Sequence, residues 1–451
     1  MKRVCLPVAP LGSVIKGKCF LALSKEECDQ HVAACTLQPT SSTAALPPPL
    51  IMAHVENNGV WVPRMYAMSR FTGMKDERGL GEALSTQETN VKLSTTPPQV
   101  QAMEVVLGVL NSDKGAAQLK LPCGFGKTVC GIWAIAQLGR KALVLVSDRG
   151  LKQQWLDRFA THAPLLIVGI VQGKKAEFDS SDVCIGMVQS LFKPNKYPAA
   201  MYEAFGTIVV DEHHLMAARE FSKVVPLFSA RHILALSATP ERDDGCTPAL
   251  EWLFGPIAFE CKRAWERVDV KSIQYTRGDR SEITFPWNQE LNYNAMLERL
   301  TVDATRNAMI VDETIKRKEN RHVIVLTARR EHIVCLQGLF AAKGLSVGIY
   351  HGDLSDDERQ VCLRTKYDVF ISIMQMGKQA LDKPELSMLV LATPIVNKYE
   401  QAVGRILRPY PDKPVPTVLD IVDPFSVFQG MARKRAKYYA SESYRVDYVS
   451  R

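Results

Sequence analysis

The sequence predicts an α/β fold with two parallel-sheet domains in tandem, preceded by a small N-terminal accessory domain. The chain has 451 residues, enough for two to four domains of roughly 100 to 200 residues each. Its composition, 46% hydrophobic and 23% charged, is typical of a globular protein and excludes a wholly disordered chain. Short β-branched runs alternate with longer helix-like segments, the pattern of a parallel sheet covered by helices. The runs span residues 142–147, 207–211, 233–237, 323–327, 369–373, 388–392 and 418–422.

Because these runs are apolar almost throughout, we expect strands that are buried on both faces of a sheet. They fall into two groups, separated by a polar, poorly periodic stretch at 266–300 that is predicted to be a linker. Before residue 93 the alternation of strands and helices is absent, and proline-rich segments indicate a separate small domain. The expected domains are therefore 1–93, 94–265 and 285–451, and the last should end in a basic helix.

Charge and cysteine content narrow the class of protein further. Fifty-six Lys and Arg residues against 48 Asp and Glu residues give a net charge of +8, which permits binding to a polyanion. No run of about 18 apolar residues occurs, so we expect neither a transmembrane helix nor a membrane partner. The eleven cysteines include no CxxC pair, which is typical of reduced thiols and predicts a cytoplasmic location. Cys28, His31 and Cys35 could supply three zinc ligands, or they could form one face of an N-terminal helix.

The last 28 residues combine positive charge with aromatic side chains. They contain six cations and two acidic residues, a balance of +4, with four interleaved tyrosines. Such a composition suits contacts with phosphates and bases. It suits equally well a terminal helix with a solvated basic face, whose tyrosines pack on the domain.

The segment LKLPCGFGKTVCGIWAIAQL predicts a phosphate-binding loop between a strand and a helix. Gly124 and Gly126 permit a turn that directs backbone N–H groups at a phosphate, at the N-terminus of the helix. Lys127 would contact the β and γ phosphates of a nucleotide, and Thr128 would hold Mg²⁺. The usual pattern GxxxxGK[ST] has glycine where this chain has Leu121, so a chance GKT tripeptide in a turn is the alternative.

The segment IVVDEHHLM would supply acidic partners for that loop. An apolar strand that ends in Asp211 and Glu212 places two carboxylates at the carboxyl edge of a parallel sheet, where such sheets bind ligands. Asp211 would bind Mg²⁺ through water, and Glu212 would orient and deprotonate the attacking water. A solvated acidic turn is the alternative, and the presence of Lys127 upstream makes it the weaker one.

The segment QAVGRILRPYPDKP, in the second group of strands, presents two arginines together. Gln401, Arg405 and Arg408 recur at helical spacing, so they project from one side of a helix. Paired arginines suit stabilisation of a γ phosphate, and a solvated helix face is the alternative. With Lys127 in the first domain, this predicts that ATP and Mg²⁺ are held between the two domains.

In this order the motifs resemble those of the superfamily 2 helicases, over about residues 97–439. LPCGFGKT is similar to motif I, LVLVSDRGLKQQW to motif Ia, IGMVQSL to the following strand-binding motif, and VVDEHH to a DExH motif II. LALSATPERDDG resembles motif III, HVIVLTARREH motif IV, GKQALDKPEL motif V and QAVGRILR motif VI. The resemblance implies two RecA-like domains that use ATP to move along a nucleic acid strand.

Details of the motifs point to one branch of that superfamily. DEHH and QxxGRxxR are unlike the DEAD-box RNA helicases, whereas ATPERDDG, LFGPIAFE and PTVLDIVDPFSVFQGMARKRAKYY resemble the XPB-like and UvsW-like DNA helicases and their viral relatives. In XPB-like proteins an Arg-Glu-Asp triplet follows motif III, and Arg242, Asp243 and Asp244 take its place here with Asp for Glu. Ala380 stands where motif V usually has glycine. The resemblance therefore implies DNA as the substrate.

The resemblance also implies roles for individual residues. Gln99 matches the glutamine that reads adenine, although Pro98 replaces the usual aromatic residue, and Asp382 would contact the nucleotide. The residues that would couple hydrolysis to strand movement are His214, Ser237, Thr239 and Gln401. The residues expected to touch the DNA backbone are Ser147, Arg149, Gln189, Ser190, Arg242 and Thr327. Simple loop polarity is the alternative for all of this last group except Arg242, whose role the replacement of Glu by Asp leaves open.

The expected function is that of an ATP-dependent DNA helicase or translocase, with 3′ to 5′ polarity, that unwinds or branch-migrates forked and recombination intermediates. The alternative is a duplex-DNA translocase that releases transcripts or bound proteins without separating strands. A nucleotide-switched binding module with a decayed ATPase is disfavoured by Lys127, Asp211, Glu212 and Arg408. The expected partners are single-stranded, forked or branched DNA and proteins of replication, recombination or transcription. The small N-terminal domain would sense DNA structure, and the source would be a bacteriophage or another virus acting in the host cytoplasm.

Overall fold

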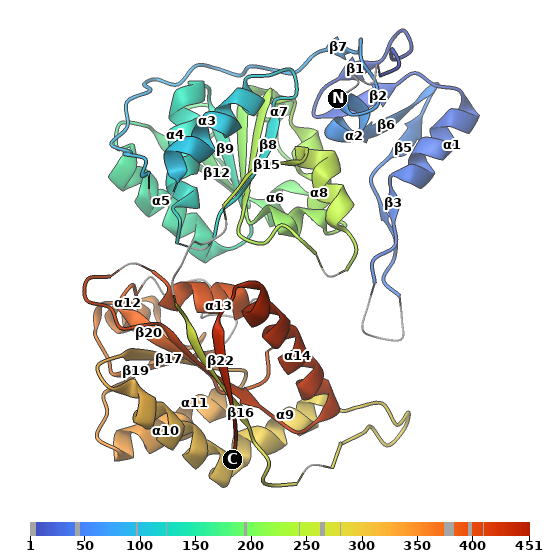
Figure 1. Cartoon of the computed structure of the whole chain (residues 1–451). Helices are drawn as coiled ribbons and strands as arrows, with labels where there is room; N and C mark the ends of the chain where they lie inside the picture. Colours follow the sequence, from blue (N-terminus) through green and yellow to red (C-terminus); the bar gives the residue numbers. More distant parts are fainter. Residues whose placement is uncertain are drawn as a thin grey trace. The chain divides into compact units, whose positions relative to one another are not determined.

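The computed structural model describes residues 6–40, 46–95, 98–122, 124–193, 196–242, 244–261, 267–279, 281–373, 383–395, 399–408 and 410–451. The chain forms two compact units, Met1–Lys262 and Arg263–Arg451 (Figure 1). The first unit contains a small N-terminal sheet and a large parallel sheet, and the second contains another parallel sheet.

The N-terminal sheet has the strand order β5-β6-β2-β1-β7. Its strands are β1 (Val14–Ile15), β2 (Lys18–Leu21), β5 (His54–Glu56), β6 (Gly59–Pro63) and β7 (Lys75–Asp76), and a separate pair is formed by β3 (Thr36–Leu37) and β4 (Leu50–Ile51). Helix α1 (Lys25–Ala34) starts at a capping box and packs on β5 and β6, and the short α2 (Arg64–Met68) follows β6. Cys19, Leu21, Val60 and Val62 alternate inward to form the core of this sheet.

Cys28, His31 and Cys35 lie on and just after α1, which confirms the interpretation as one side of an N-terminal helix. Cys28 and Cys35 are buried, and Nδ1 of His31 lies 2.9 Å from the hydroxyl of Tyr66. Within the described residues, no group of three or more His, Cys, Asp or Glu side chains is arranged to hold a metal ion. These side chains therefore serve the core of the small sheet.

The large sheet of the first unit has the order β11-β10-β12-β9-β13-β14-β8-β15, and only β11 runs antiparallel to its neighbour. The strands are β8 (Ala116–Lys120), β9 (Ala142–Val146), β10 (Val168–Gln172), β11 (Lys175–Ala176), β12 (Val183–Met187), β13 (Thr207–Asp211), β14 (His232–Ser237) and β15 (Ile257–Glu260). Every residue of β9, β13 and β14 is buried, which confirms the three runs predicted here as strands covered on both faces.

Helices cover both faces of this sheet. One face carries α3 (Gln99–Leu110), α4 (Lys127–Leu138) and α5 (Arg149–His162), whose apolar residues share a core with those of β8, β9, β13 and β14. The other face carries α6 (Val188–Leu191), α7 (Ala199–Ala204), α8 (Thr247–Phe254) and the 3₁₀ turns His213–Ala217, Phe221–Lys223 and Val225–Leu227. This two-sided covering explains why the strands are apolar throughout.

The sheet of the second unit is parallel throughout, with the order β18-β19-β17-β20-β21-β16-β22. Its strands are β16 (Asp269–Gln274), β17 (His322–Thr327), β18 (Val347–Tyr350), β19 (Val369–Ile373), β20 (Leu386–Leu391), β21 (Thr417–Val422) and β22 (Arg445–Ser450). Its helices are α9 (Tyr293–Val302), α10 (Ala304–Lys318), α11 (Arg330–Ala342), α12 (Asp356–Arg364), α13 (Tyr399–Ile406) and α14 (Ser426–Ser441).

Two strands of this sheet differ from the sequence-based expectation. β16 lies inside the stretch predicted to be a linker and before residue 285, where the second domain was expected to begin. β22 follows the basic helix that was expected to end the chain. β22 is the edge strand, and β16 lies between it and β21. β16 mixes polar residues with buried ones, and no residue of β22 is buried, so neither forms an apolar run.

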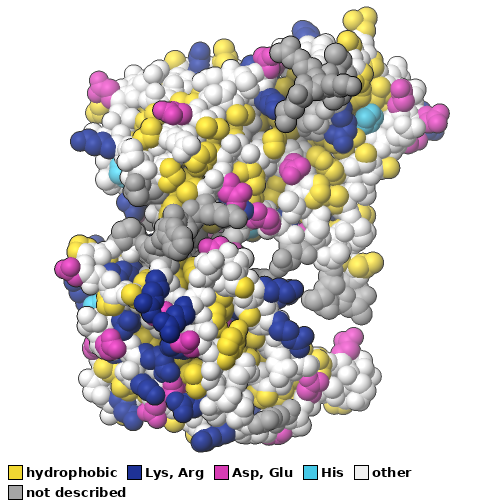
Figure 2. All heavy atoms as spheres, viewed as in Figure 1, with side chains coloured by type: hydrophobic (Ala, Val, Ile, Leu, Met, Phe, Trp, Pro, Cys, Tyr) yellow, Lys and Arg dark blue, Asp and Glu magenta, His cyan; other side chains and the backbone are white. Residues whose placement is uncertain are grey.

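The C-terminal helix α14 packs its tyrosines on the domain, which favours the second of the two interpretations of this segment. Tyr439 is buried, and the rings of Tyr438, Tyr439 and Tyr444 lie within 6.3 Å of one another. The cations Arg433, Lys434 and Lys437 are exposed. Figure 2 shows Lys and Arg side chains gathered on the visible face of the second unit. Among the described residues, no helix has both the length and the apolar composition to cross a membrane.

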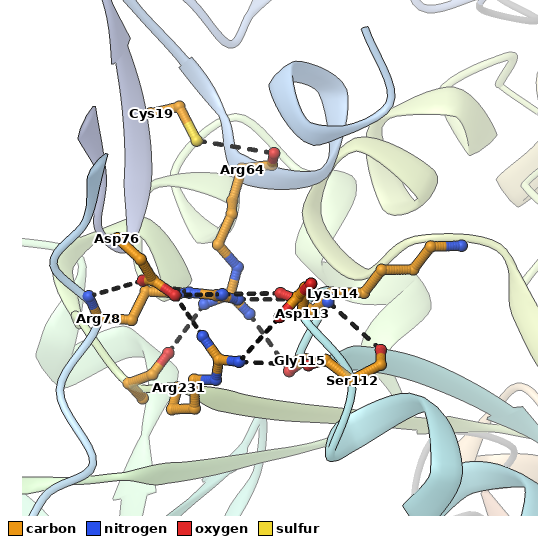
Figure 3. Close-up of polar contacts among 10 residues, drawn as sticks. Cys19, Arg64, Asp76, Arg78, Ser112, Asp113, Lys114, Gly115 and Arg231 are labelled. Carbon is orange, nitrogen blue, oxygen red and sulfur yellow. Dashed lines mark hydrogen bonds and ion pairs between the residues drawn. The ribbon is translucent and has the colours of Figure 1, made fainter. Parts of the chain in front are cut away.

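An arginine cluster joins the N-terminal sheet to the large sheet of the first unit (Figure 3). Arg78 pairs with Asp76, with 2.7 Å between Nη2 and Oδ2, and donates to the backbone carbonyls of Asp113 and Lys114 at 2.7 and 2.9 Å. Arg231, just before β14, forms a second ion pair with Asp76. The N-terminal sheet is therefore tied to the loop between α3 and β8.

Arg64 extends the same cluster from the start of α2. Its guanidinium is fully buried and donates to the carbonyl oxygen of Ala230 at 2.8 Å and to that of Gly115 at 3.4 Å. Burial and the neighbouring charge of Arg78 lower the pKa of Arg64 to about 9. The two sheets of this unit are therefore joined by buried polar contacts, and Leu50 and Met65 also belong to the core of the large sheet.

Candidate nucleotide site

The phosphate-binding loop lies between the carboxyl end of β8 and the start of α4, as predicted. Gly124 and Gly126 have φ values of 87° and 79°, a region that glycine adopts without strain. Lys127 is the first residue of α4, and its Nζ donates to the carbonyl oxygen of Leu121 at 3.2 Å. Leu121 is buried in the core, which accounts for its presence where the usual pattern has glycine.

The acidic pair follows β13, two strands away from β8 in the sheet. Asp211 is the last residue of β13, beside Leu236 of β14, and β14 in turn pairs with β8. Asp211 is 4% exposed, and its Oδ1 accepts a hydrogen bond of 3.0 Å from the backbone N–H of Glu212. Consecutive strands therefore bring the carboxylates and the phosphate-binding loop to the same edge of the sheet.

Glu212 has a φ of 51°, in the left-handed region that is strained for any residue except glycine. This conformation turns the chain sharply out of β13 into the 3₁₀ turn that contains His214. Residues held in such conformations concentrate at functional sites, because the surrounding structure must impose them. The strain at Glu212 is therefore an independent sign that this turn has a function beyond connecting two elements.

The two carboxyl groups have opposite pKa shifts. Burial and the negative charge of Glu212 raise the pKa of Asp211 above its ordinary value. Burial would also raise the pKa of Glu212, but the adjacent His214 and the charge of Lys127 outweigh it and hold that pKa below its ordinary value. Glu212 is thus an ionised carboxylate suited to act as a base, and Asp211 is suited to bind a cation.

The expected coupling residues meet beside Glu212. Nδ1 of His214 lies 3.4 Å from Oε2 of Glu212 and 3.3 Å from Oγ of Ser237, which ends β14. The same Oγ accepts a hydrogen bond of 3.1 Å from the backbone N–H of Thr239. Three of the four predicted residues therefore form one contact chain from the acidic pair to the segment after β14. The side chain of the fourth, Gln401, lies outside the described part of the structure.

Gln99 lies against the phosphate-binding loop at the start of α3. Its Nε2 donates to the carbonyl oxygen of Phe125 at 2.8 Å, and its Oε1 accepts from the backbone N–H of Ser94 at 2.9 Å. A Cβ atom on Gly126 would lie 2.3 Å from Nε2 of Gln99. Contact with adenine stays a prediction, whereas the observed bonds give Gln99 a role in fixing the loop.

Residues expected to contact the DNA backbone are partly brought together. Gln189 is exposed, and its side-chain amide donates to the carbonyl oxygen of Ser147. Arg149 is exposed at the start of α5. Ser190 is 9% exposed, and its hydroxyl accepts a hydrogen bond from the backbone N–H of Gly173. Strand contacts by these side chains remain predictions.

Two of the predicted strand contacts are not supported. Thr327 is fully buried, and its hydroxyl lies 2.8 Å from Nδ1 of His332. The guanidinium of Arg242 pairs with Asp244 and donates to the carbonyl oxygen of His214 at 2.6 Å. Both side chains are engaged in hydrogen bonds inside the first or second unit, so the motif positions that suggested DNA contacts are used for local structure here.

In the second unit, Arg405 lies in the last turn of α13 and is 8% exposed, and Arg408 follows the helix. The buried guanidinium of Arg435, from α14, binds Asp420 and donates to the carbonyl oxygen of Ile395 at 2.9 Å, ahead of α13. Asp382, with Ala380 and most of motif V, and Asp243 lie outside the described residues. Arg405 and Arg408 as phosphate ligands therefore remain a prediction.

The residues expected to hold Mg²⁺ have suitable donors. The hydroxyl of Thr128 and the carboxylate of Asp211 are oxygen ligands, the type that Mg²⁺ prefers. Oε2 of Glu212 is buried, and its neighbour there is Nδ1 of His214 at 3.4 Å, an arrangement that suits a base held in place for a bound water. This donor set fits Mg²⁺ carried with a nucleotide.

Sequence reasoning missed Trp155, which contacts the acidic pair directly. Its indole Nε1 donates to Oδ2 of Asp211 at 2.8 Å, and the side chain is completely buried. The neighbouring Gln154 donates to the hydroxyl of Thr128 at 3.4 Å. The tryptophan in the otherwise polar segment LKQQW was a possible sign of a buried contact, but its partner is identified only when α5 is packed on the sheet.

Comparisons with known proteins agree with this geometry. The sequence-family model described as type III restriction enzyme, res subunit, matches residues 92–242. The family model described as helicase conserved C-terminal domain matches residues 305–410. The Putative ATP-dependent RNA helicase L396 of Acanthamoeba polyphaga mimivirus is 27% identical over 412 residues, covering 88% of this chain and 78% of that protein. The chain belongs to the superfamily 2 helicases, which are ATP-hydrolysing enzymes.

Solved structures confirm the fold. Dbp5 of S. cerevisiae, bound to RNA and ADP BeF3, matches with a TM-score of 0.52 at 15% identity, covering 78% of this chain and 89% of that chain. The match to UvsW of phage T4 covers 96% of this chain and 97% of that chain at 15% identity, with a TM-score of 0.39. The predicted fold class, two RecA-like domains with an additional N-terminal region, is therefore confirmed.

Proposed function

We propose that this helicase is a DNA motor that uses ATP hydrolysis to unwind or branch-migrate forked and recombination intermediates, moving 3′ to 5′. The main support is the meeting of Lys127, Asp211 and Glu212 at the carboxyl ends of the adjacent strands β8, β14 and β13. Such an arrangement can bind a triphosphate and position a water for attack on it.

In this proposal each residue has one chemical task. Backbone N–H groups of the phosphate-binding loop and Nζ of Lys127 bind the phosphates, while Thr128 and Asp211 hold Mg²⁺, which neutralises phosphate charge when it is bound. Glu212 takes the proton from the attacking water, because its carboxylate is kept ionised. Arg405 and Arg408 supply further positive charge to the γ phosphate.

Hydrolysis would reach the strand through the contact chain from Glu212 to His214, Ser237 and Thr239. Loss of the γ phosphate alters the charge beside Glu212, and His214 can pass this change to the segment after β14. The exposed residues Arg149 and Gln189 would then alter their contacts with the DNA backbone. Because those contacts are with phosphates, binding should depend on salt more than on sequence.

Two other substrates are candidates. RNA is favoured by the mimivirus relative, which is named a putative ATP-dependent RNA helicase, and by the RNA bound to Dbp5. A duplex-DNA translocase that releases transcripts or bound proteins would use the same ATP site without separating strands. The preference for DNA rests on the DEHH and QxxGRxxR motifs. A viral source, protein partners in replication, recombination or transcription, and action in the host cytoplasm stay predictions.

One set of assays tests the proposal. ATP hydrolysis should be stimulated by single-stranded, forked and four-way-junction DNA, and a labelled strand should be displaced from the fork. Displacement of a triplex strand without unwinding would favour the translocase, and stimulation by RNA alone would favour RNA as the substrate. Hydrolysis that no nucleic acid stimulates would contradict the proposal.

A further inference from the structure

Helix α5 contacts both residues that are expected to hold Mg²⁺. Trp155 donates its indole N–H to Oδ2 of Asp211 at 2.8 Å, and Gln154 reaches the hydroxyl of Thr128 at 3.4 Å. The other oxygen of Asp211 accepts the backbone N–H of Glu212. Both oxygens of this carboxylate are therefore fixed by donors, one of which comes from a different element of the fold.

The position of Trp155 is itself fixed by packing. The side chain is completely buried, and its ring centroid lies 5.9 Å from that of Phe159, one turn further along α5. On the facing helix α4, a Cβ atom at Gly131 would lie 2.7 Å from Cη2 of Trp155. The absence of a side chain at Gly131 thus makes room for the indole.

A buried tryptophan needs a partner for its N–H, and a backbone carbonyl would satisfy that need as well as a carboxylate. In this protein the partner is the buried carboxylate at the end of β13, which is the proposed cation ligand. Outer hydrogen bonds of this kind orient metal ligands, and their loss commonly reduces metal affinity or activity by about 10- to 100-fold.

We infer that Trp155 is a positioning residue for the Mg²⁺ site, because its indole N–H holds Asp211 in the orientation that binds the cation. In the same inference, α5 links this site to the bound DNA strand. The helix begins at Arg149, an exposed residue expected to contact the DNA backbone. A shift of α5 caused by strand binding would therefore move the donor to Asp211 directly. The inference rests on the proposed function, because it concerns the same nucleotide site.

The test measures how strongly Mg²⁺ enhances nucleotide binding, without requiring hydrolysis. The affinity of the full-length protein for a fluorescent ADP analogue is measured in Mg²⁺ and in EDTA, and the ratio of the two is compared among variants. Trp155→Phe removes the N–H donor, and this ratio should fall about tenfold or more while affinity in EDTA is unchanged. Trp133→Phe, on the facing helix α4, is the matched control and should keep the ratio of the native protein.

A second substitution guards against a packing effect. Benzothienylalanine at position 155 replaces the indole N–H by sulfur at nearly the same size, and it should lower the ratio as Trp155→Phe does. Phe159→Leu weakens the contact between the rings but leaves the donor, so its ratio should fall less than that of the benzothienylalanine protein. A native ratio in the benzothienylalanine protein would overturn the inference. Failure of the native protein to bind any nucleotide would instead overturn the proposed function, and the inference with it.

Discussion

At the scale of single residues, the site depends on groups whose charge is set by their neighbours. Lys127 lies at the start of α4 and lowers the pKa of Glu212, while Glu212 raises the pKa of Asp211. Removing one of these three side chains should therefore change the pKa values of the others. Such a substitution should affect ATP hydrolysis more than DNA binding, because the exposed residues expected to contact DNA lie on α5 and α6.

Lys127→Ala should abolish ATP hydrolysis while DNA binding stays within about threefold of the native value. The lysine supplies charge to the phosphates, and loss of one such group commonly costs about 100-fold or more in rate. Lys175→Ala is a suitable control, because Lys175 is an exposed residue of β11 whose side chain pairs with Glu177. Steady-state ATPase assays and fluorescence anisotropy with labelled DNA provide the measurements. Hydrolysis at the native rate in Lys127→Ala would refute the site assignment.

His332 should make the second unit less stable in acid. Its Nδ1 lies 2.8 Å from the hydroxyl of Thr327 and its Nε2 lies 2.9 Å from Oδ1 of Asn307, an environment for the neutral ring. Burial, with the charge of Arg306, lowers its pKa to about 3. The unfolded chain, with a histidine pKa of about 6.5, binds the proton first, so stability is full above about pH 6.5 and falls as the pH decreases toward 3.

The effect can be isolated by comparing urea unfolding at pH 7.5 and pH 5. The native protein should lose about 1–2 kcal/mol of unfolding free energy through this histidine, and His332→Gln should show a loss smaller by that amount. An equal loss of unfolding free energy in both proteins would show that protonation of His332 is not its cause. His332→Gln is also expected to be less stable than the native protein at pH 7.5, because two buried hydrogen bonds are changed.

The sequence predicted the phosphate-binding loop, the acidic pair and their meeting, because each depends on residues adjacent in the chain at the end of a strand. It did not predict the bond from Trp155 to Asp211, which joins two elements distant in sequence. It also predicted that Thr327 contacts the DNA backbone, although the Thr327 hydroxyl is hydrogen-bonded inside the domain. Motifs report which chemistry is present, whereas the partners of polar side chains depend on packing.

Among the elements, strands buried on both faces were predictable, whereas β16 and β22 were not. β9, β13 and β14 are continuous apolar runs, and the structure has them as strands. β16 mixes polar residues with buried ones, and β22, the edge strand beside it, has no buried residue, so their sequences resemble linkers. A strand without a continuous apolar run gives a weaker sequence pattern.

The arginine cluster is the element-scale feature that the sequence did not indicate. Residues after β7 also contact the large sheet. Glu82 forms an ion pair with Lys141, and the backbone N–H and the hydroxyl of Ser85 both donate to the carboxylate of Asp182. Cutting the chain at residue 93 would therefore remove contacts of the RecA-like fold as well as the small sheet. The N-terminal sheet belongs to the same compact unit as the nucleotide site.

Arg78→Met should lower the free energy of unfolding of this unit by about 2–3 kcal/mol. The side chain of Arg78 is 1% exposed, and its loss leaves Asp76 without one partner and two backbone carbonyls without a donor. Lys75→Met, at an exposed position that pairs with Glu77, should leave the free energy of unfolding nearly unchanged. Urea unfolding monitored by tryptophan fluorescence measures both. Equal stability of the two variants would mean that the cluster does not join the sheets energetically.

For the whole molecule, the proposed function is that of a motor in which one nucleotide site drives movement along a nucleic acid strand. Two parallel-sheet units, family models that match in the same order, and the contact chain from Glu212 to Thr239 agree with this. The substrate is the part that the fold leaves open, because both DNA and RNA motors use it. The proposed hydrolysis depends most of all on one claim: Glu212, at the turn after β13, is the proposed base.

The most direct test of that claim is single-turnover ATP hydrolysis by Glu212→Gln in the presence of forked DNA. The amide keeps the shape of the side chain but does not accept a proton. The rate should fall at least about 100-fold, while ATP affinity stays within about threefold of the native value. A native rate of DNA-stimulated hydrolysis in this variant would contradict the account.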